Sequence, residues 1–230
     1  MQNKKIFIII PAFNEEQKIF GVVQKIFDLG YKNIIVVDDG STDGTKKILE
    51  DLKNQGKISF VSHFINKGAG AATQTGFDFA LQKGAEICVT IDADGQHNPD
   101  EIQKLVDPIL NGECEVVIGS RFLNLQKMPV YRIIFNKIGN LITWFFFGLY
   151  VSDSQSGFKA FSKKALQKVK IENNGYEFCS EIIQKIHSNN LKFKEVQISV
   201  KYTKYSQSKG QSLINGLKTL LKLFLHSLIK

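Results

Sequence analysis

The sequence has few of the features that mark secreted, membrane-spanning or repeat proteins. Its three cysteines lie far apart and form no CxxC motif. This argues against a disulfide framework or a redox site and indicates buried thiols in a reducing compartment. Its apolar stretches are shorter or more interrupted than the about 20 residues that a membrane-spanning helix needs. We find no internal repeats and no low-complexity linker, which favours one globular domain.

The N-terminus lacks the pattern of a secretory signal. The apolar run IFIII is short, ends at Pro11, and is followed by the acidic residues Glu15 and Glu16. A signal peptide has a longer apolar stretch and a cleavage site of small residues. The segment is therefore predicted to be a first strand, and a cytoplasmic location follows.

The charge of the chain is unevenly distributed. The 230 residues carry a formal net charge of +8, with −2 in residues 1–158 and +10 in residues 159–230. A basic C-terminal third suggests an anionic partner, although lysine also serves simply to keep a surface soluble. We see no aromatic–basic RNA motif and no zinc finger, which argues against nucleic acid. An anionic membrane surface is the better candidate, with the protein peripheral at the inner face of the cell membrane.

Short apolar runs alternate with helix-like stretches through the first 120 residues. This alternation predicts an α/β domain with a mostly parallel sheet flanked by helices on both faces. The predicted strands cover residues 5–10, 33–39, 58–63, 86–94 and 115–120. The predicted helices cover residues 15–29, a stretch from Ser41, residues 69–82 and residues 99–110.

The pattern changes after residue 120. Residues 130–151 are rich in bulky apolar groups and predict a core or interfacial helix, and residues 193–200 predict a late strand. Residues 211–230 place Leu213, Leu217 and further leucines at helical spacing, which predicts an amphipathic helix. Residues 1–210 are thus expected to form the main α/β domain. The terminal helix either lies in a bilayer interface or packs on the domain itself or on another copy of the chain.

Three polar clusters follow predicted strands, at residues 11–16, 38–43 and 92–97. The carboxyl ends of parallel strands meet at one edge of a sheet, where ligands bind. Asp92 and Asp94 can both turn toward one ion, and such hard oxygen ligands suit Mg²⁺ or Mn²⁺. Gln96 or His97 would add a further ligand. The alternative is that the pair forms an Asp-Gly turn that caps the next helix.

Other phosphate-binding motifs fit less well. An apolar strand ending in DxDG is also typical of a phosphohydrolase nucleophile, but that motif usually follows the first strand rather than the fourth. A Rossmann GxGxxG should also follow the first strand, where residues 11–16 read PAFNEE instead. The glycines of residues 66–72 either approach a phosphate or sugar, or form a tight strand–helix turn.

The arginines indicate a special role. Arg121 and Arg132 are the only arginines among 30 basic residues. A planar guanidinium grips phosphate with two hydrogen bonds, which lysine cannot do. Arg121 lies just past the fifth predicted strand and is therefore a candidate phosphate ligand; the alternative is a partly buried surface arginine.

Taken in order, these segments resemble a known family. PAFNEE, VVDDGSTDGT, NKGAGAA, DADGQHNPDEI, GSRF, SDSQSGFKAF and YSQSKGQS resemble family 2 glycosyltransferases, especially the dolichol-phosphate-mannosyltransferase-like group of polyprenyl-phosphate sugar transferases. The resemblance covers roughly residues 5–212. It implies a GT-A fold, a nucleoside-diphosphate-sugar donor and an inverting mechanism.

The resemblance also assigns residues. The nucleotide base and ribose would be held by Pro11, Phe13, Glu15 and Asp39; the metal and diphosphate by Asp92, Ala93, Asp94 and Gln96; phosphates by Arg121 and Lys209. One departure concerns Thr203, because the mannosyltransferases carry an arginine at that place. Lys201 or Lys204 would have to substitute, and this leaves the donor and acceptor identities open.

The acceptor decides whether a base is required. A lipid phosphate is already anionic near neutral pH, whereas a sugar hydroxyl must lose a proton to a carboxylate. Asp153 is the candidate base, and its alternative role is to orient a basic residue near the diphosphate. A further alternative is a membrane-peripheral binding protein whose catalytic site has degenerated. The presence of Asp39, Asp92, Asp94 and Arg121 argues against it.

Overall fold

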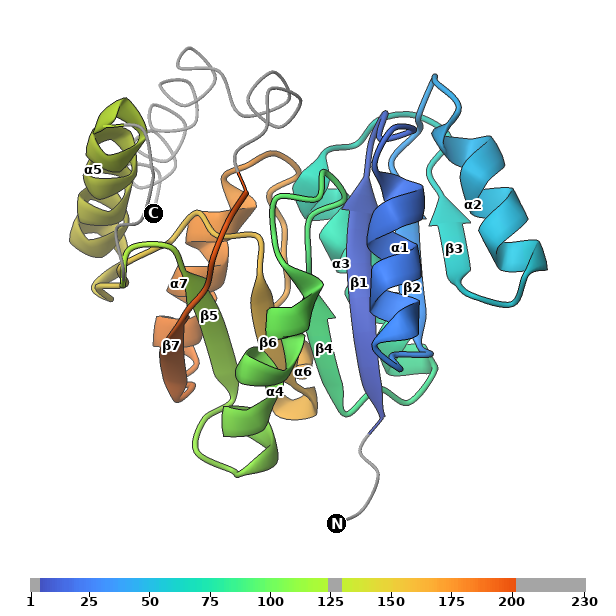
Figure 1. Ribbon diagram of the computed structural model, residues 1–230. Coiled ribbons are helices and arrows are strands. Elements are labelled where there is room, and N and C mark those ends of the chain that lie inside the picture. Colours follow the sequence, from blue (N-terminus) through green and yellow to red (C-terminus); the bar gives the residue numbers. More distant parts are fainter. Residues whose placement is uncertain (1–4, 124–129, 202–230) are drawn as a thin grey trace.

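The computed structural model describes residues 5–123 and 130–201 and shows one seven-stranded sheet with helices on both faces (Figure 1). The strand order is β3-β2-β1-β4-β6-β5-β7. The strands are β1 (Ile6–Ala12), β2 (Ile34–Asp38), β3 (Ser59–Ser62), β4 (Ile87–Thr90), β5 (Val116–Ser120), β6 (Lys159–Ser162) and β7 (Phe193–Gln197). The helices are α1 (Ile19–Asp28), α2 (Thr45–Asn54), α3 (Ala69–Gln82), the 3₁₀ turn η1 (Pro99–Glu101), α4 (Ile102–Leu110), α5 (Val130–Phe147), α6 (Lys163–Lys168) and α7 (Phe178–Ser188).

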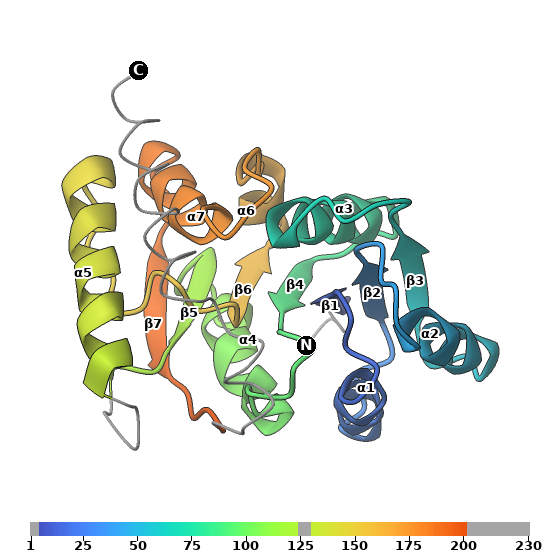
Figure 2. The same ribbon diagram turned by 90° about the horizontal axis from the view of Figure 1, so that it is seen from above.

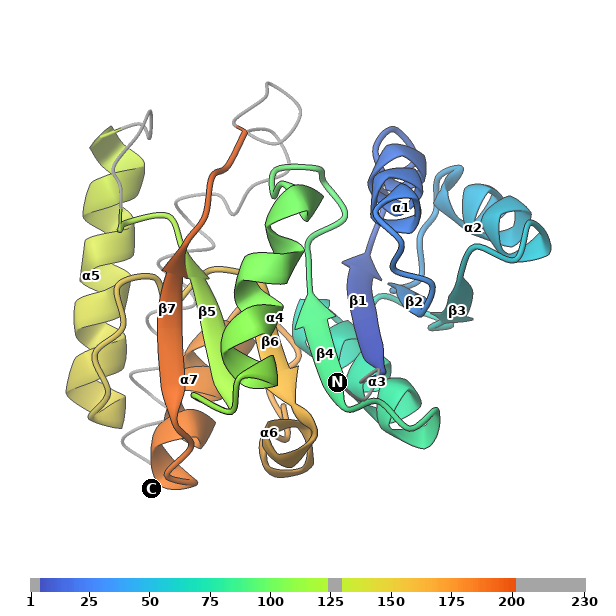
Figure 3. The same cartoon turned by 60° about the horizontal axis from the view of Figure 1, so that its bottom comes forward.

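The sheet is mostly parallel, as the sequence predicts. Only β6 runs antiparallel, to both β4 and β5, while β5 pairs in parallel with β7. The remaining strands share one direction, so their carboxyl ends lie at the same edge of the sheet. Figure 3 shows β7 and β3 at the two lateral ends of the sheet and β4 near its middle.

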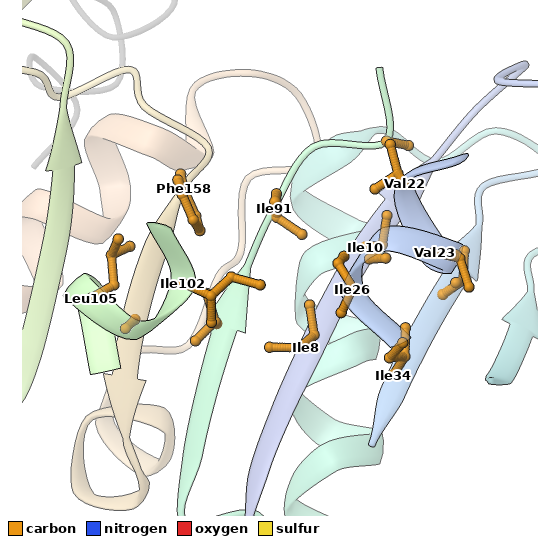
Figure 4. Close-up of a cluster of buried hydrophobic side chains, with 14 of the residues drawn as sticks. Ile8, Ile10, Val22, Val23, Ile26, Ile34, Ile91, Ile102, Leu105 and Phe158 are labelled. Carbon is orange, nitrogen blue, oxygen red and sulfur yellow. The ribbon is translucent and has the colours of Figure 1, made fainter. Parts of the chain in front are cut away.

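The period-2 alternation of the strands divides the core into two layers. Ile8 and Ile10 of β1 pack with α1, α2 and α4, whereas Phe7 and Ile9 pack with α3, α6 and α7. Figure 2 shows these two helical layers on opposite sides of the sheet. Figure 4 shows the first of them, where Ile8 and Ile10 meet Val22, Val23 and Ile26 of α1. A strand buried on both faces explains the near-continuous apolar run at the start of the chain.

Several elements match their predicted ranges, and others begin later. Helix α3 covers the predicted residues 69–82, but α2 starts at Thr45 rather than near Ser41, and α1 starts at Ile19 rather than Glu15. In both late starts the preceding residues are engaged in a hydrogen-bonded loop that a helix would break. The sequence analysis did not predict β6, α6 or α7.

Helix α5 confirms the predicted helix after residue 120. Thr143 and Asn140 are buried on the side that faces α7 and the segment after α5, and the Thr143 hydroxyl lies 3.1 Å from that of Ser180. The opposite side exposes an apolar stripe at helical spacing, formed by Ile134, Ile138, Leu141 and Phe145. Among residues 5–123 and 130–201, no helix combines the length and apolarity needed to cross a bilayer.

Candidate active site

The loops after β1 and β2 are joined by hydrogen bonds, so the first two predicted clusters do converge. The Asn14 amide donates to the Ser41 hydroxyl at 3.0 Å, and the Thr42 amide donates to Asn14 Oδ1 at 2.8 Å. The Glu15 amide donates to Thr45 Oγ1 at 2.7 Å. Asn14 has a φ of +54°, a left-handed conformation that asparagine tolerates better than most residues. The local polar sequence therefore folds into one rigid double loop.

Asp39 is buried at the end of β2 and its carboxylate is engaged within the chain. Oδ1 accepts the Lys67 amide at 2.9 Å and Oδ2 accepts the Gly68 amide at 2.6 Å. His63 Nδ1 lies 2.6 Å from Oδ1, and its Nε2 lies 2.9 Å from Thr75 Oγ1. A carboxylate offers about four acceptor positions, and three of them are used here. Asp39 thus anchors the loop that leads into α3.

This geometry gives Asp39 a structural role in addition to its proposed contact with the nucleotide. We expect Asp39→Ala to lower the free energy of unfolding by about 1–3 kcal/mol, because buried amide donors lose their acceptor. Urea denaturation measures the loss, and Asp28→Ala, at an exposed carboxylate on α1, serves as the matched control. Equal midpoints for the two variants would contradict the anchoring role.

Asp92 and Asp94 lie beyond β4, at the centre of the sheet edge. Asp94 accepts the Gln96 amide at 2.9 Å on Oδ1, and its Oδ2 accepts the Gln96 side-chain amide. Removal from bulk water and the negative charge of Asp92 both raise the pKa of Asp94 above its ordinary value. Two neighbouring carboxylates with this mutual repulsion fit a divalent cation, which would relieve it.

His97 contacts the Asp92 carboxylate directly. Its Nε2 lies 3.0 Å from Asp92 Oδ2, and its ring lies against Phe158 with centroids 5.2 Å apart. Burial alone would raise the pKa of Asp92, but the hydrogen bond with His97 and the charges of Lys159 and Arg121 hold it below its ordinary value. His97 therefore orients Asp92. In the described ranges, no three His, Cys, Asp or Glu side chains gather in a metal-binding cluster. Gln96 contacts Asp94 directly.

The segment before β6 passes very close to Asp92. A Cβ atom at Gly157 would overlap the Asp92 carboxylate, so any larger residue there would displace the Asp92 side chain. Thr90 Oγ1 donates to the Gly157 carbonyl at 2.7 Å and fixes this approach. Lys159 follows on β6 with its side chain fully buried, and its ammonium group donates to the Ser156 carbonyl. The sequence analysis missed Lys159; a lysine between apolar residues in FKAF was the available signal.

Arg121 and Asp153 form a buried ion pair at the end of β5. Arg121 Nε and Nη2 each donate to one carboxylate oxygen of Asp153 at 2.7 Å, and the Arg121 amide donates to Oδ2 at 3.0 Å. Asp153 is 0% exposed. Both of its oxygens are thus committed to Arg121, as the orienting role requires.

Helix α5 holds the segment that carries Asp153. Ser154 donates its amide and its hydroxyl to Asn140 Oδ1, at 3.0 and 2.8 Å. The Asn140 side-chain amide donates in turn to the Ser152 carbonyl. The exposed apolar helix is in this way linked to the arginine–aspartate pair through one buried side chain.

The glycines of residues 66–72 serve packing. Cβ atoms at Gly68 and Gly70 would overlap the carbonyls of Asn174 and Asn173, and the Gly70 amide donates to the Asn174 carbonyl at 2.8 Å. The loop before α7 therefore lies directly on the start of α3. Of the two roles considered for these glycines, the contacts support a tight strand–helix turn rather than a close approach to a phosphate or sugar.

Some of the other predicted site residues lie within the described part of the chain, and others lie outside it. Pro11 and Phe13 lie at the end of β1, with Phe13 partly exposed, and Ala93 is buried between the two aspartates. Lys209, Thr203, Lys204 and the helix of residues 211–230 lie outside the described residues. The sequence analysis did not single out Tyr176, which lies just before α7. Burial and the negative charges of Asp92, Asp94 and Glu15 raise the pKa of its phenol.

Comparison with known proteins agrees with this geometry. The family model for Glycosyl transferase family 2 matches residues 7–170. A UDP-N-acetylglucosamine–dolichyl-phosphate N-acetylglucosaminyltransferase from Methanococcus voltae is 42% identical over 98% of this chain and 97% of its own length. A polyprenol monophosphomannose synthase from Mycolicibacterium smegmatis is 29% identical, over 85% of this chain and 77% of its own.

Solved structures show the same fold at low sequence identity. One is a glucosyl-3-phosphoglycerate synthase from Mycobacterium tuberculosis crystallised with Mn²⁺, UDP-glucose and phosphoglyceric acid. It has a TM-score of 0.66 and 21% identity, covering 96% of this chain and 80% of that one. The fold is the GT-A fold that the sequence motifs imply. With the family model spanning most of the described strands and helices, the chain belongs to glycosyl transferase family 2 and is a glycosyltransferase.

Proposed function

We propose that this glycosyltransferase moves a sugar from a nucleoside-diphosphate sugar to a polyprenyl phosphate, with inversion at the anomeric carbon and with a bound Mg²⁺ or Mn²⁺. The observation that carries the proposal is the repelling pair Asp92 and Asp94, set beside the positively charged Arg121 and Lys159. Such an arrangement suits a metal-bound diphosphate. Membership of the family removes support for the phosphohydrolase alternative.

A UDP-sugar is the proposed donor. The Methanococcus voltae relative is named for UDP-N-acetylglucosamine and dolichyl phosphate, and it is similar along nearly the whole chain. Pro11, Phe13 and Glu15 lie on the double loop at the end of β1, beside Asp39, where the base and ribose would bind. Asp39 would contact the nucleotide through its remaining acceptor position, or through the loop of residues 66–68 that it anchors.

The residues present fit a divalent metal. Asp92, Asp94 and the Gln96 side chain offer hard oxygen ligands, and Ala93, between the two aspartates, would lie near the diphosphate. When bound, the ion would neutralise the charge that grows on the departing diphosphate. The solved Mn²⁺ and UDP-glucose complex of a structural neighbour supports a divalent ion.

Other residues of this chain would assist the transfer of the sugar from the nucleoside diphosphate to the acceptor. Arg121, held in place by Asp153, would contact phosphate oxygens, together with Lys209. A lipid-phosphate oxygen is anionic near neutral pH and attacks without a base. Transfer to a sugar hydroxyl, the alternative, needs Asp153 as base, and the double contact with Arg121 favours the orienting role for this carboxylate.

One experiment tests the proposal directly. The protein is incubated with polyprenyl phosphate, Mn²⁺ and, separately, UDP-N-acetylglucosamine, UDP-glucose or GDP-mannose, and the extracted lipid is examined for sugar. We expect UDP-N-acetylglucosamine to give a glycosylated lipid of inverted anomeric configuration. Transfer only to sugar hydroxyls would establish the alternative acceptor, and release of free sugar alone would contradict both.

A membrane-surface location is part of the proposal. The exposed stripe of α5, in which Phe145 is 77% exposed, is an apolar surface where a polyprenyl tail could rest. The sequence of residues 211–230 predicts an amphipathic helix, which would add to this surface. The basic residues 159–230 suit anionic lipid. The protein would thus be peripheral at the inner face of the cell membrane. A second copy of the chain is the other candidate to cover these surfaces.

We expect the intact protein to co-sediment with anionic liposomes and to be released by about 0.5 M salt, because screening weakens the lysine contribution. Deletion of residues 212–230 should abolish sedimentation while nucleotide binding survives. Leu141→Glu on α5 should weaken it, whereas Leu29→Glu, at an exposed leucine after α1, should not. The lipid-surface proposal would be contradicted if the protein stays in the supernatant of the liposome assay at low salt and forms a dimer in analytical ultracentrifugation without lipid.

A further inference from the structure

The loop of residues 171–177 is held by hydrogen bonds to α7 and to the start of α3. Glu181 of α7 accepts the amides of Glu172 and Asn173, both at 2.9 Å. On its other side the loop lies on the start of α3, through the Gly70 amide and the Asn174 carbonyl. The Phe178 amide also donates to the Gly175 carbonyl at 3.2 Å, so the residues on both sides of Tyr176 are held by hydrogen bonds.

Tyr176 is 46% exposed, so about half of its surface is open to a ligand. Burial of the remaining half and the carboxylates of Asp92, Asp94 and Glu15 raise the pKa of its phenol, so that it stays protonated. These carboxylates come from the ends of β4 and β1. Backbone contacts place the loop there independently: the Tyr176 carbonyl accepts the Cys179 amide at 3.3 Å, and the Cys179 thiol donates to the Gln155 carbonyl at 4.0 Å. Gln155 lies two residues before Gly157, which packs against Asp92. Tyr176 therefore lies near the end of β4.

No hydrogen bond of the Tyr176 hydroxyl is found within residues 5–123 and 130–201, so a ligand can use it as donor or acceptor. The ring supplies a flat apolar face, and aromatic side chains with few polar groups are typical linings of small-molecule sites. A pyranose has the complementary form, since its C–H groups make an apolar face and its hydroxyls project around the ring. The transferred sugar is covalently joined to the diphosphate and must lie near Asp92 and Asp94.

We propose that Tyr176 contacts the transferred sugar of the donor, with its ring against the pyranose and its hydroxyl on a sugar hydroxyl, and that it contributes to the choice of sugar. This inference rests on the proposed function. It assigns Tyr176 no part in binding the nucleoside diphosphate itself.

Calorimetry with Mn²⁺ separates the two parts of the donor. We expect Tyr176→Ala to bind UDP as the wild type does, but to bind UDP-N-acetylglucosamine roughly three- to tenfold more weakly, the scale of a lost aromatic contact. Its ratio of kcat/KM between UDP-N-acetylglucosamine and UDP-glucose should fall toward one. Tyr176→Phe should keep the ring contribution and lose only the hydroxyl contribution. Tyr31→Phe is the matched control, because Tyr31 precedes β2 at the opposite edge of the sheet and donates to Gln103.

The outcomes separate this inference from the proposed function. If the wild type binds UDP and UDP-sugar and Tyr176→Ala alters both equally or neither, the sugar contact is overturned and the proposed function stands. If the wild type binds neither UDP nor any UDP-sugar, the proposed function falls, and this inference falls with it. A loss confined to the KM for polyprenyl phosphate would place Tyr176 at the acceptor and overturn the donor assignment.

Discussion

Asp94→Asn should reduce sugar transfer by about a hundred- to a thousandfold, the effect of losing several kcal/mol of charge stabilisation at the diphosphate. Asparagine keeps the size of the side chain and can still accept the Gln96 amide, which lies 2.9 Å from Oδ1. What it removes is the negative charge that a divalent ion requires. The loss is therefore expected in turnover rather than in folding.

The sign of the stability change is a separate part of this prediction. A carboxyl whose pKa is raised in the folded state binds its proton more tightly there than in the unfolded chain, so its ionisation destabilises the fold as pH rises. The pKa of Asp94 is raised by burial and by Asp92. At neutral pH without metal, Asp94→Asn should thus unfold at the same temperature as the wild type or slightly higher.

Thermal shift with and without Mn²⁺ and UDP checks both parts. Ligands that bind only the folded state raise its apparent stability, so the wild type should gain stability on adding both and Asp94→Asn should gain little. Asp100→Asn is the matched control, because Asp100 is exposed and pairs with Lys25 at the surface. Full wild-type turnover in excess EDTA would contradict the metal site altogether.

The sequence predicts the fold best where an apolar run and the polar motif after it both indicate the end of a strand. The apolar runs before Asp39 and Asp92 are strands because they are buried on both faces, and the polar residues that follow them lie at one edge because parallel strands place them there. The loops that begin at Pro11 and Asp38 are joined by side-chain hydrogen bonds that no periodicity encodes. This is why α1 and α2 start later than predicted.

Long-range pairing accounts for what the sequence does not reveal. Strand β6 enters between β4 and β5 in the opposite direction, and only this insertion places Gly157 against Asp92 and buries Lys159. The loop that carries Tyr176 lies on the start of α3, which comes much earlier in the chain. Such contacts depend on the order of strands in the sheet, and a pattern read along the chain does not contain that order.

Arg121→Lys should lower kcat/KM about 5- to 150-fold, corresponding to about 1–3 kcal/mol for a hydrogen bond to a charged group. Lysine keeps the positive charge but cannot reproduce the two parallel bonds from Nε and Nη2 to Asp153. A lysine ammonium would therefore lose the fixed orientation that phosphate binding needs. Unchanged kcat/KM would show that Arg121 is only structural.

Asp153→Asn decides between the orienting role and the base role of this carboxylate. If Asp153 only orients Arg121, the double variant Arg121→Lys/Asp153→Asn should be little worse than the poorer single variant, because the two side chains act as one unit. If Asp153 is a base, Asp153→Asn should be far worse than Arg121→Lys, and the two effects should add.

Stability gives the control for that comparison. Removing one partner of a buried ion pair typically costs about 3–5 kcal/mol, because the other charge stays in the protein interior. Asp153→Asn, at a side chain that is 0% exposed, should thus lower the urea midpoint more than Arg121→Lys, which keeps both charges. Rates must be compared under conditions in which both variants are folded. We expect the orienting role, because the Asp153 carboxylate is 0% exposed and accepts three hydrogen bonds from Arg121, two from the guanidinium and one from the amide.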